Sequence, residues 1–306
     1  MVSSVTARAP GKVNIALLVG PVRADGYHPL ASVFHAVALD EDVTVEAAPA
    51  GSGLSIAEVT GPQAEDVPRD SGNLAWQAVE LVADRLGRPA DASIRIAKGV
   101  PVAGGMAGGS ADAAAGLVAA NELWGGELDR AELHDLAAEL GSDVPFSLLG
   151  GTALGLGRGE QLSPLMVRGR FHWVFATAFG GLSTPLVYRT LDRLGTATPT
   201  AGLEAPADLV AALISGDAKA LGRGLVNDLQ EPAISLRPTL RDVLETGRSA
   251  GALGAMVCGS GPTCAFLVAD EAAAIDVSAA LGGRSDVRST HRTTGPEPGA
   301  RVIAHR

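Results

Sequence analysis

The residues best suited to chemistry lie in a glycine-rich segment, residues 101–116, with the sequence PVAGGMAGGSADAAAG. Four of its glycines fall within the six positions 104–109, and glycine lets a backbone approach a ligand closely. The alanine-rich run 111–124 behind them favours a helix, with Ser110 as its N-cap. The free N–H groups and the positive end of a helix start attract anions. The segment therefore predicts a loop that binds phosphate.

Two better-known phosphate-binding patterns do not fit this segment. A Walker A loop needs a lysine where Ser110 stands. A dinucleotide fingerprint needs an acidic residue at the end of a second strand about 20 residues further on, and the sequence has no clear candidate. A flexible turn that leads into a core helix is the alternative to phosphate binding.

Three other polar residues stand where catalysis or simple structure would each explain them. Lys12 and Asn14 share one face of a predicted strand, 13–19, because side chains alternate along a strand and the apolar residues take the other face. They are either solvated or part of a site. Asp143 follows a helix predicted over 129–140 and precedes Pro145, where it is either a cap for local backbone or a functional carboxylate.

Composition narrows the class of protein. The 306 residues can form one large or two ordinary domains, and the net charge of −10 without a basic block argues against a nucleic-acid partner. The first residues lack the apolar core of a signal peptide, and no run of 18 apolar residues predicts a membrane span. Cys258 and Cys264 predict two buried thiols rather than a disulfide scaffold. We expect a soluble cytoplasmic protein.

The basic residues are unevenly divided between the two types. Of 24 lysines and arginines, only Lys12, Lys98 and Lys219 are lysine, so arginine serves nearly everywhere that a positive charge is needed. Two of the three lysines flank glycine-bearing motifs. A compact ammonium group cannot be replaced freely by a planar guanidinium beside a reacting group. This predicts that Lys12 and Lys98 are functional and that Lys219, in an exposed helical turn, is not.

The elements that must position these residues form two groups, separated by a boundary at residues 163–169. In the first group we expect a turn at Pro10–Gly11, a hairpin turn at Asp25–Gly26 and regular elements that comprise strands 4–9, 13–19, 32–39, 42–47, 92–97 and 150–159 and helices 71–86, 111–124 and 129–140. In the second we expect strand 171–176, a helix led by Ser183 or Thr184 with Pro185 at its first position, a helix over 215–231 broken at 227–228, helix 235–250, a hairpin over 251–268, helix 271–281, a mobile polar segment 284–299 and a last strand, 301–304.

Three motifs in this order resemble those of the galactokinase, homoserine kinase, mevalonate kinase and phosphomevalonate kinase superfamily. They are the PGKVN stretch at 10–14, the glycine-rich segment at 101–116 and the GSGP turn at 259–262, and they span nearly the whole chain. The resemblance implies an α+β fold in two lobes with the active site in the cleft between them. It implies residues 1–165 as a nucleotide-binding and catalytic domain and 166–306 as a substrate domain. It also implies transfer of the γ-phosphoryl group of ATP to a hydroxyl group, with Mg²⁺.

A fourth stretch, RADGYH at 23–28, is similar to one branch of this superfamily, the 4-diphosphocytidyl-2-C-methyl-D-erythritol kinases. This resemblance implies the 2-hydroxyl group of that cytidyl polyol as the acceptor, in the non-mevalonate route to isoprenoid precursors. It implies that Tyr27 and Tyr188 enclose the cytosine. The other residues implied to contact substrate are Asn14, His28 and Thr184.

The superfamily resemblance also implies the catalytic and nucleotide-binding residues. Asp143 would take or orient the proton of the acceptor hydroxyl, and Lys12 would stabilise the developing charge. The residues implied to contact ATP are Asn73, Lys98, Pro101, Val102, Ala103, Gly104, Gly105, Met106, Ala107, Gly108, Gly109, Ser110 and Ala111. Many superfamily members have a Ser-Ser pair in the second motif, but here Gly109 takes the first place, so Ser110 alone is the implied Mg²⁺ contact.

Several alternatives stay open at this point. Asn73 is either an N-cap, which we favour, or a contact of the nucleotide base, and a role of Asp112 at the metal is undecided. Another kinase of the superfamily, acting on homoserine or a mevalonate, is the main alternative function. A non-catalytic relative that senses nucleotide and sugar, or a plain nucleotide-binding interaction domain, would have no use for both Lys12 and Asp143. The sequence does not predict an oligomeric state.

Overall fold

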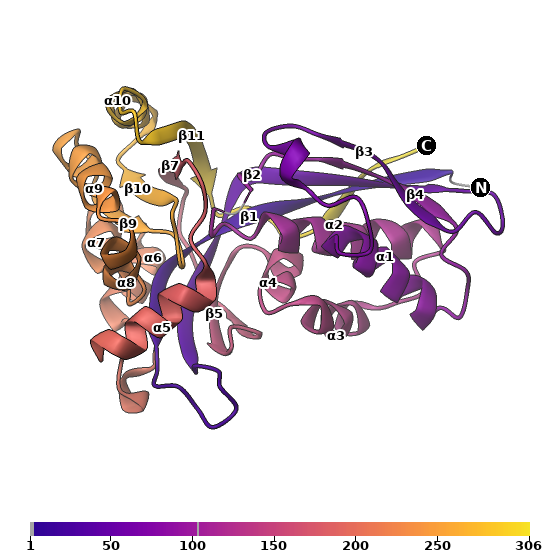
Figure 1. Cartoon of the computed structure of the whole chain (residues 1–306), viewed down its shortest axis with the longest axis horizontal. Helices are drawn as coiled ribbons and strands as arrows, with labels where there is room; N and C mark the ends of the chain where they lie inside the picture. The colour runs from indigo at the N-terminus through magenta and orange to yellow at the C-terminus, as the bar shows by residue number, and fades with distance from the viewer. Residues whose placement is uncertain (1–2, 103) are drawn as a thin grey trace.

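The computed structural model describes residues 3–102 and 104–306, and it has the α+β architecture that the resemblance implies. Figure 1 shows two sheets, each with its own layer of helices, placed side by side along the longest axis. The first sheet has eight strands, and its main path runs in the order β12-β1-β2-β4-β3. The second has four strands in the order β11-β7-β10-β9.

The elements have the following bounds. The first sheet contains β1 (Ser4–Val19), β2 (Leu30–Ala47), β3 (Leu54–Thr60), β4 (Ala92–Ala97), β5 (Thr152–Gly157), β6 (Gln161–Pro164), β8 (Val226–Asn227) and β12 (Arg301–His305). The second contains β7 (Phe171–Ala178), β9 (Gly254–Val257), β10 (Cys264–Val268) and β11 (Val287–Gly295). The helices are α1 (Leu74–Arg85), α2 (Gly108–Leu123), α3 (Arg130–Leu140), α4 (Val144–Leu149), α5 (Thr184–Leu194), α6 (Ala207–Ser215), α7 (Ala218–Gly224), α8 (Gln230–Leu236), α9 (Thr239–Ser249) and α10 (Glu271–Gly282), with short 3₁₀ turns η1 (Ala64–Asp66) and η2 (Thr200–Gly202).

The first two strands are much longer than predicted. β1 and β2 pair antiparallel along their length. The strands predicted over 4–9 and 13–19 form one strand, as do those over 32–39 and 42–47, so the prediction of a turn at Pro10–Gly11 was wrong. The pairing register shifts between Pro10 and Gly11, where two residues of β2 have no partner. Such a bulge lets the chain bend and twist without ending the ladder. The turn predicted at Asp25–Gly26 does connect the two strands.

Helices α1 to α4 cover one face of the first sheet (Figure 1). α2 lies in the middle of this layer, and nearly all of its alanines are fully buried. α3 begins, near the predicted start, with a capping box between Asp129 and Glu132. α2 begins at Gly108, with Ala107 at its N-cap, so the prediction of Ser110 as the cap was wrong. The two glycines 108 and 109 adopt helical backbone angles and form the first turn, which places Ser110 inside the helix.

In the second half, α6 was not predicted, and two predicted segments have a different structure. The helix expected over 215–231 consists of α7, a short strand β8 that pairs with β1, and the start of α8. The segment 284–299, expected to be mobile, contains β11, an edge strand that pairs with β7 over its length. Its polar residues suit this position, because an edge strand has one exposed side and is often polar. None of the helices among the described residues is long and apolar enough to cross a membrane.

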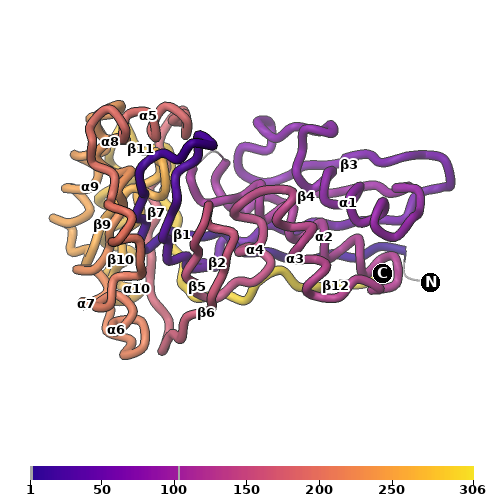
Figure 2. The backbone as a smooth tube through the Cα atoms, turned by 90° about the horizontal axis from the view of Figure 1, so that it is seen from below, coloured from indigo at the N-terminus to yellow at the C-terminus, as the bar shows by residue number. Residues whose placement is uncertain are grey.

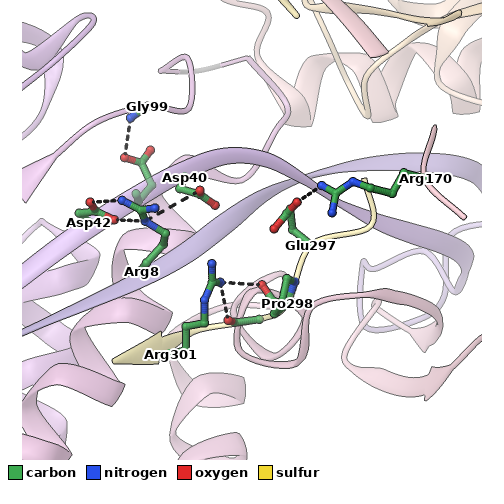
Figure 3. A network of polar contacts seen from close by, with 10 residues as sticks. Arg8, Asp40, Asp42, Gly99, Arg170, Glu297, Pro298 and Arg301 are labelled. Atoms are coloured by element: carbon green, nitrogen blue, oxygen red, sulfur yellow. Dashed lines mark hydrogen bonds and ion pairs between the residues drawn. The ribbon is translucent and has the colours of Figure 1, made fainter. Parts of the chain in front are cut away.

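The chain returns to the first sheet at its end. β12 pairs with β1, and Figure 2 shows both termini at the same end of the molecule. Figure 3 shows polar contacts along this return path. The guanidinium of Arg8 lies 2.7 Å from both carboxylate oxygens of Asp42, Arg170 pairs with Glu297, and Arg301 donates to the carbonyl of Pro298. Just before β12, the N–H of Ala300 donates to the carbonyl of Ser147 in α4, and this hydrogen bond helps to fix that helix.

Candidate active site

A cavity of about 820 Å³ lies between the two halves. Residues from β1, β2, the 21–29 turn, α5 and the start of α4 line it. It brings together all the residues that the sequence assigns to catalysis and to the acceptor: Lys12, Asn14, Tyr27, His28, Asp143, Thr184 and Tyr188. These residues are spread over more than half of the chain, so the fold alone unites them.

Lys12 and Asp143 form an ion pair in this cavity. The Lys12 ammonium lies 3.4 Å from Asp143 Oδ2, and the exposed fractions of the two side chains are 6% and 32%. Asp143 occupies the N-cap position of α4, but its side chain accepts no capping hydrogen bond. The structural alternative for Asp143 therefore fails, since its carboxylate faces Lys12 and the cavity instead of the helix.

A chain of hydrogen bonds holds the Lys12 side chain in place. Its ammonium donates to Asn14 Oδ1 at 2.6 Å, Asn14 Nδ2 donates to Ser32 Oγ at 2.7 Å, and Ser32 donates to the carbonyl of Ala16. The backbone N–H of Lys12 donates to the carbonyl of Met106, at 3.1 Å. The lysine is thus tied both to the strand and to the glycine-rich loop, and its position is set before any ligand arrives.

The aromatic residues gather at another part of the cavity wall. The rings of His28 and Tyr188 have centroids 5.1 Å apart, and His28 Nδ1 donates to the carbonyl of Gly20 at 2.7 Å. Tyr27 is 55% exposed, which leaves its ring available to a ligand. Burial raises the pKa of Tyr188 to about 12, so its hydroxyl group stays protonated near neutral pH. This set of flat rings suits a planar base.

Sequence reasoning missed three residues of this cavity. The Arg158 guanidinium lies 5.3 Å from the centre of the Tyr27 ring, and the Lys12 ammonium lies 5.7 Å from that of Phe34. Ser260, in the GSGP turn, shares a hydrogen bond of 2.8 Å with Thr184. Arg158 stands between two glycines in a turn, a signal that could have marked it. Phe34 carried no such signal in the sequence, because buried aromatic residues are common in strands.

A second cavity, of about 310 Å³, lies on the other side of the glycine-rich loop. Of the residues implied to contact ATP, those that line it are Asn73, Lys98, Pro101, Val102, Gly104, Gly105, Ala107, Gly108 and Gly109. Gly105 and Ala107 line both cavities, so the loop forms the wall between them. Met106 and Ala111 have fully buried side chains and can offer only backbone. Ser110 lies in the first turn of α2, and Ala103 lies outside the described residues.

The loop conformation depends on glycine and on the GSGP turn. Gly105 has φ +75°, and a Cβ atom there would collide with the carbonyl oxygen of Cys258. A Cβ atom at Gly104 would lie 2.6 Å from Thr263 Oγ1. The hairpin that carries the GSGP turn thus lies against the loop and leaves no room for side chains at the two positions. The N–H groups of the first turn of α2, from Gly108 to Ser110, have no acceptor within the helix and can bind an anion.

Asn73 lies at the edge of this second cavity and caps α1. Its Oδ1 accepts from the N–H of Ala75 at 2.8 Å, and its Nδ2 donates to the carbonyl of Pro68 at 2.8 Å. The cap that the sequence favoured is confirmed. Because both ends of its amide already have partners, any contact with a nucleotide base would come from the backbone around it.

Beneath the loop, Lys98 forms a buried cluster with two carboxylates. Its ammonium lies 2.8 Å from Glu41 Oε1 and also bonds Asp112 Oδ2, and all three side chains are at most 4% exposed. Burial is the largest cause that raises the pKa of Glu41 to about 8 and that of Asp112 to about 6, and Lys98 opposes both shifts. Sequence reasoning missed Glu41, because an acidic residue in a strand gives no sign of which distant residue it meets.

No group of three or more His, Cys, Asp or Glu side chains that could hold a metal ion occurs in residues 3–102 and 104–306. A magnesium ion carried by nucleotide phosphates needs only one or two protein ligands. Asp112 fits that requirement, because it lines the second cavity and its buried Oδ1 has no hydrogen-bond partner among the described residues. Ser110 lies two residues before it in the same helix turn.

Comparison with known proteins adds independent findings. Residues 73–151 match the family described as GHMP kinases N terminal domain, and residues 209–285 match GHMP kinases C terminal. The chain is 55% identical to the 4-diphosphocytidyl-2-C-methyl-D-erythritol kinase of Rhodococcus jostii, over 98% of this chain and 95% of the relative. It is 53% identical to the protein of the same name from Mycobacterium tuberculosis H37Rv, over 98% of this chain and 93% of the relative.

Solved structures agree with the sequence comparison. A crystal structure of 4-(cytidine 5'-diphospho)-2C-methyl-D-erythritol kinase is similar with a TM-score of 0.75 and 34% identity, over 94% of this chain and 98% of that one. The homoserine kinase of Cytophaga hutchinsonii gives a TM-score of 0.76 at 21% identity, over 99% of this chain and 98% of that one. The second likeness concerns the fold alone.

Proposed function

Since the chain belongs to the GHMP kinases and, within them, to the 4-diphosphocytidyl-2-C-methyl-D-erythritol kinases, we propose that it phosphorylates 4-diphosphocytidyl-2-C-methyl-D-erythritol. ATP is the donor, and the 2-hydroxyl group of the polyol is the acceptor. One observation carries the proposal. The Lys12–Asp143 pair shares a cavity with Tyr27, His28 and Tyr188, and only the glycine-rich loop separates that cavity from a second one suited to a triphosphate.

The donor lies in the second cavity. Its phosphates follow the loop and meet the N–H groups at the start of α2, which stabilise negative charge without having to reorient. Every residue that lines this cavity precedes residue 113, whereas the acceptor cavity also takes residues from α5 and the GSGP turn. This supports the division into a nucleotide-binding part, 1–165, and a substrate part, 166–306.

Transfer occurs beside the Lys12–Asp143 pair. The oxygen of the 2-hydroxyl group attacks the γ-phosphorus, a new O–P bond forms, and the bond from that phosphorus to the β–γ bridging oxygen breaks to release ADP. Asp143 accepts the hydroxyl proton, and Lys12 stabilises the charge on the transferring group. Because the transition state of phosphoryl transfer is loose, positioning and charge stabilisation supply most of the rate.

Mg²⁺ bound to the nucleotide would neutralise phosphate charge. Asp112, which lines the second cavity, would hold it, and Ser110, two residues earlier in α2, is the other proposed contact. On the acceptor side, Tyr27 and Tyr188 enclose the cytosine, and His28, Asn14 and Thr184 offer hydrogen bonds to the rest of the substrate. The substrates are soluble metabolites, and we place the enzyme in the cytoplasm, in the non-mevalonate route to isoprenoid precursors.

An acceptor panel tests the proposal. The purified protein is incubated with ATP and Mg²⁺ and with one of three acceptors: 4-diphosphocytidyl-2-C-methyl-D-erythritol, homoserine or mevalonate. We expect a phosphorylated product, identified by mass, only with the cytidyl polyol. 2-C-methyl-D-erythritol without the cytidine diphosphate is the matched control and should be a poor acceptor. Preferred phosphorylation of homoserine or mevalonate would contradict the proposed acceptor.

A further inference from the structure

Glu41 has an unusual position for a carboxylate that touches neither cavity. It lies in β2 just beyond the bulge opposite Pro10 and Gly11, and its side chain is fully buried. Burying a carboxylate costs free energy unless partners compensate for the lost water. Its partners therefore explain why a carboxylate is buried here, and all of them belong to the ends of the phosphate loop.

Three contacts join Glu41 to the loop. Its Oε2 accepts from the N–H of Gly99 at 3.1 Å, and its Oε1 pairs with Lys98 at 2.8 Å, so both residues that follow β4 are fixed. At the other end, a Cβ atom added to Gly108 would lie 3.0 Å from Glu41 Oε1. Lys98 continues the connection to Asp112 in the first turn of α2. One carboxylate thus holds the entrance of the loop and the start of the helix behind it.

This cluster is a poor source of stability. Two buried carboxylates share one ammonium group, and the raised pKa values of Glu41 and Asp112 reflect the cost of charging them there. Replacing buried ion pairs with apolar residues often leaves a protein as stable or more so. What such a cluster does supply is a fixed geometry, because the Lys98 ammonium must lie between Glu41 Oε1 and Asp112 Oδ2 to pair with both.

We propose that Glu41 is a positioning residue for the phosphoryl donor, which holds Lys98 and the phosphate loop in the shape that binds ATP. The inference rests on the proposed function, since it takes the second cavity as the ATP site. Glu41 acts through Lys98, Gly99 and Asp112, two of which line that cavity, and it touches no ligand itself. A loop displaced by about 1 Å would lose much of its fit to the phosphates.

The substitution Glu41→Gln tests this. The shape is kept, but one of the two acceptor oxygens becomes an NH₂ donor, which must face either the Lys98 ammonium or the Gly99 N–H. Lys98 remains paired with Asp112, so we expect the variant to fold. The dissociation constant for ATP, measured by calorimetry at pH 8.5, above the pKa of about 8 of Glu41, should rise about 10-fold, which corresponds to about 1.4 kcal/mol. The KM for the cytidyl acceptor should stay within about twofold.

The chain offers a matched control on the same strand. Glu46 also lies in β2 and pairs with a basic residue of β4, Arg95 at 2.7 Å, but its side chain is 42% exposed and lies far along the sheet from the loop. Glu46→Gln should leave the affinities for ATP and for the acceptor unchanged. Should Glu41→Gln fail to fold, Glu41→Asp keeps the charge on a shorter side chain and should raise the ATP dissociation constant by a smaller factor.

Two results would overturn the inference: an unchanged ATP affinity in a folded Glu41 variant, or an equal loss of affinity for ATP and acceptor together with a lower melting temperature. The second pattern would make Glu41 a purely structural residue. A wild-type protein that binds neither ATP nor the cytidyl polyol would reject the proposed function first, and the positioning role with it. The wild-type measurement therefore separates the two failures.

Discussion

Two clusters of lysine and carboxylate lie on opposite sides of the phosphate loop, and they differ chiefly in access to water. On the acceptor side, Lys12 faces an Asp143 carboxylate that is about a third exposed and has no capping bond. On the donor side, Lys98 is enclosed by Glu41 and Asp112, and water reaches almost none of the three. We therefore propose different roles for the same residue types: a proton acceptor in the first cluster and a fixed support in the second.

The difference shows how burial selects the role of a carboxylate. A carboxylate open to a cavity can meet a substrate hydroxyl and accept its proton. A carboxylate sealed beneath a loop has its pKa raised by burial and meets only its fixed partners. Changes on the acceptor side should thus affect chemistry and acceptor binding, and changes on the donor side should affect ATP binding.

The largest effect is expected for Asp143→Asn. Without the carboxylate the acceptor hydroxyl loses its proton acceptor, and kcat should fall by about 10²- to 10⁴-fold while ATP still binds. Steady-state kinetics measure kcat, and calorimetry measures ATP binding. The corresponding change on the donor side, Asp112→Asn, should weaken ATP binding more than it lowers kcat. A kcat within threefold of wild type for Asp143→Asn would remove the catalytic assignment.

The next effect is expected for Lys12→Arg. The lysine is enclosed by Asn14, Asp143 and the ring of Phe34, and a wider planar guanidinium must displace one of them or the acceptor. A displacement of about 1 Å can cost about 10²-fold in rate. Lys219→Arg, on the exposed side of α7, is the matched control and should keep wild-type activity. An active Lys12→Arg enzyme would speak against a role at the reacting centre.

Tyr27→Ala should separate acceptor binding from donor binding. Stacking of a base on an aromatic ring contributes about 1–3 kcal/mol, so the KM for the cytidyl polyol should rise roughly 5- to 150-fold while that for ATP changes little. Initial rates with each substrate varied in turn give both constants. An equal rise in the two KM values would indicate that Tyr27 only packs against its neighbours, Arg158 among them.

Lys98→Arg should have a smaller effect, of about 10-fold on the KM for ATP. A guanidinium can still pair with Glu41 and Asp112, but its fork is larger than the ammonium that now fits between them. The KM for the acceptor should not change, in contrast to Lys12→Arg. A loss of kcat as large as that of Lys12→Arg would show that the two lysines share one role, and the comparison between the clusters would fail.

The smallest effect concerns the dependence of stability on pH. The pKa of Glu41 is raised to about 8 in the folded protein, from an ordinary value of 4.5, so the folded state holds this proton more tightly than the unfolded chain does. Its contribution to stability is therefore greatest below pH 4.5 and is lost as the pH rises to 8.

Melting temperatures at pH 5.5 and pH 8.5 test this, and each kcal/mol should correspond to about 2–4 °C. From pH 5.5 to pH 8.5 the melting temperature of wild type should fall more than that of Glu41→Gln. The variant should still show part of the fall, because the pKa of Asp112 is raised as well. Glu46→Gln should follow wild type. Equal losses in Glu41→Gln and wild type would mean that Glu41 is charged at both pH values.

The sequence by itself determined the features that depend on short stretches of chain. The glycine-rich loop, the capping box at Asp129 and the turn at Asp25–Gly26 follow from local backbone preferences, and the structure has all three. Lys12, Asp143 and the Tyr27–His28 pair were found because each stands within a short motif. That they meet in one cavity required the fold, since no local rule brings residue 12 to residue 143.

Only the tertiary structure decided the features that depend on distant partners. The side chain of Glu41, just beyond the bulge in β2, bonds Gly99, which lies 58 residues further along the chain. β1 continues through Pro10–Gly11 because β2 pairs with it on both sides of that point, and β11 is a strand because β7 lies beside it. Asp143 was ambiguous until its side chain was seen to leave α4 uncapped and face Lys12. In each case the deciding contact lies far away in the sequence, where periodicity and capping preferences carry no information.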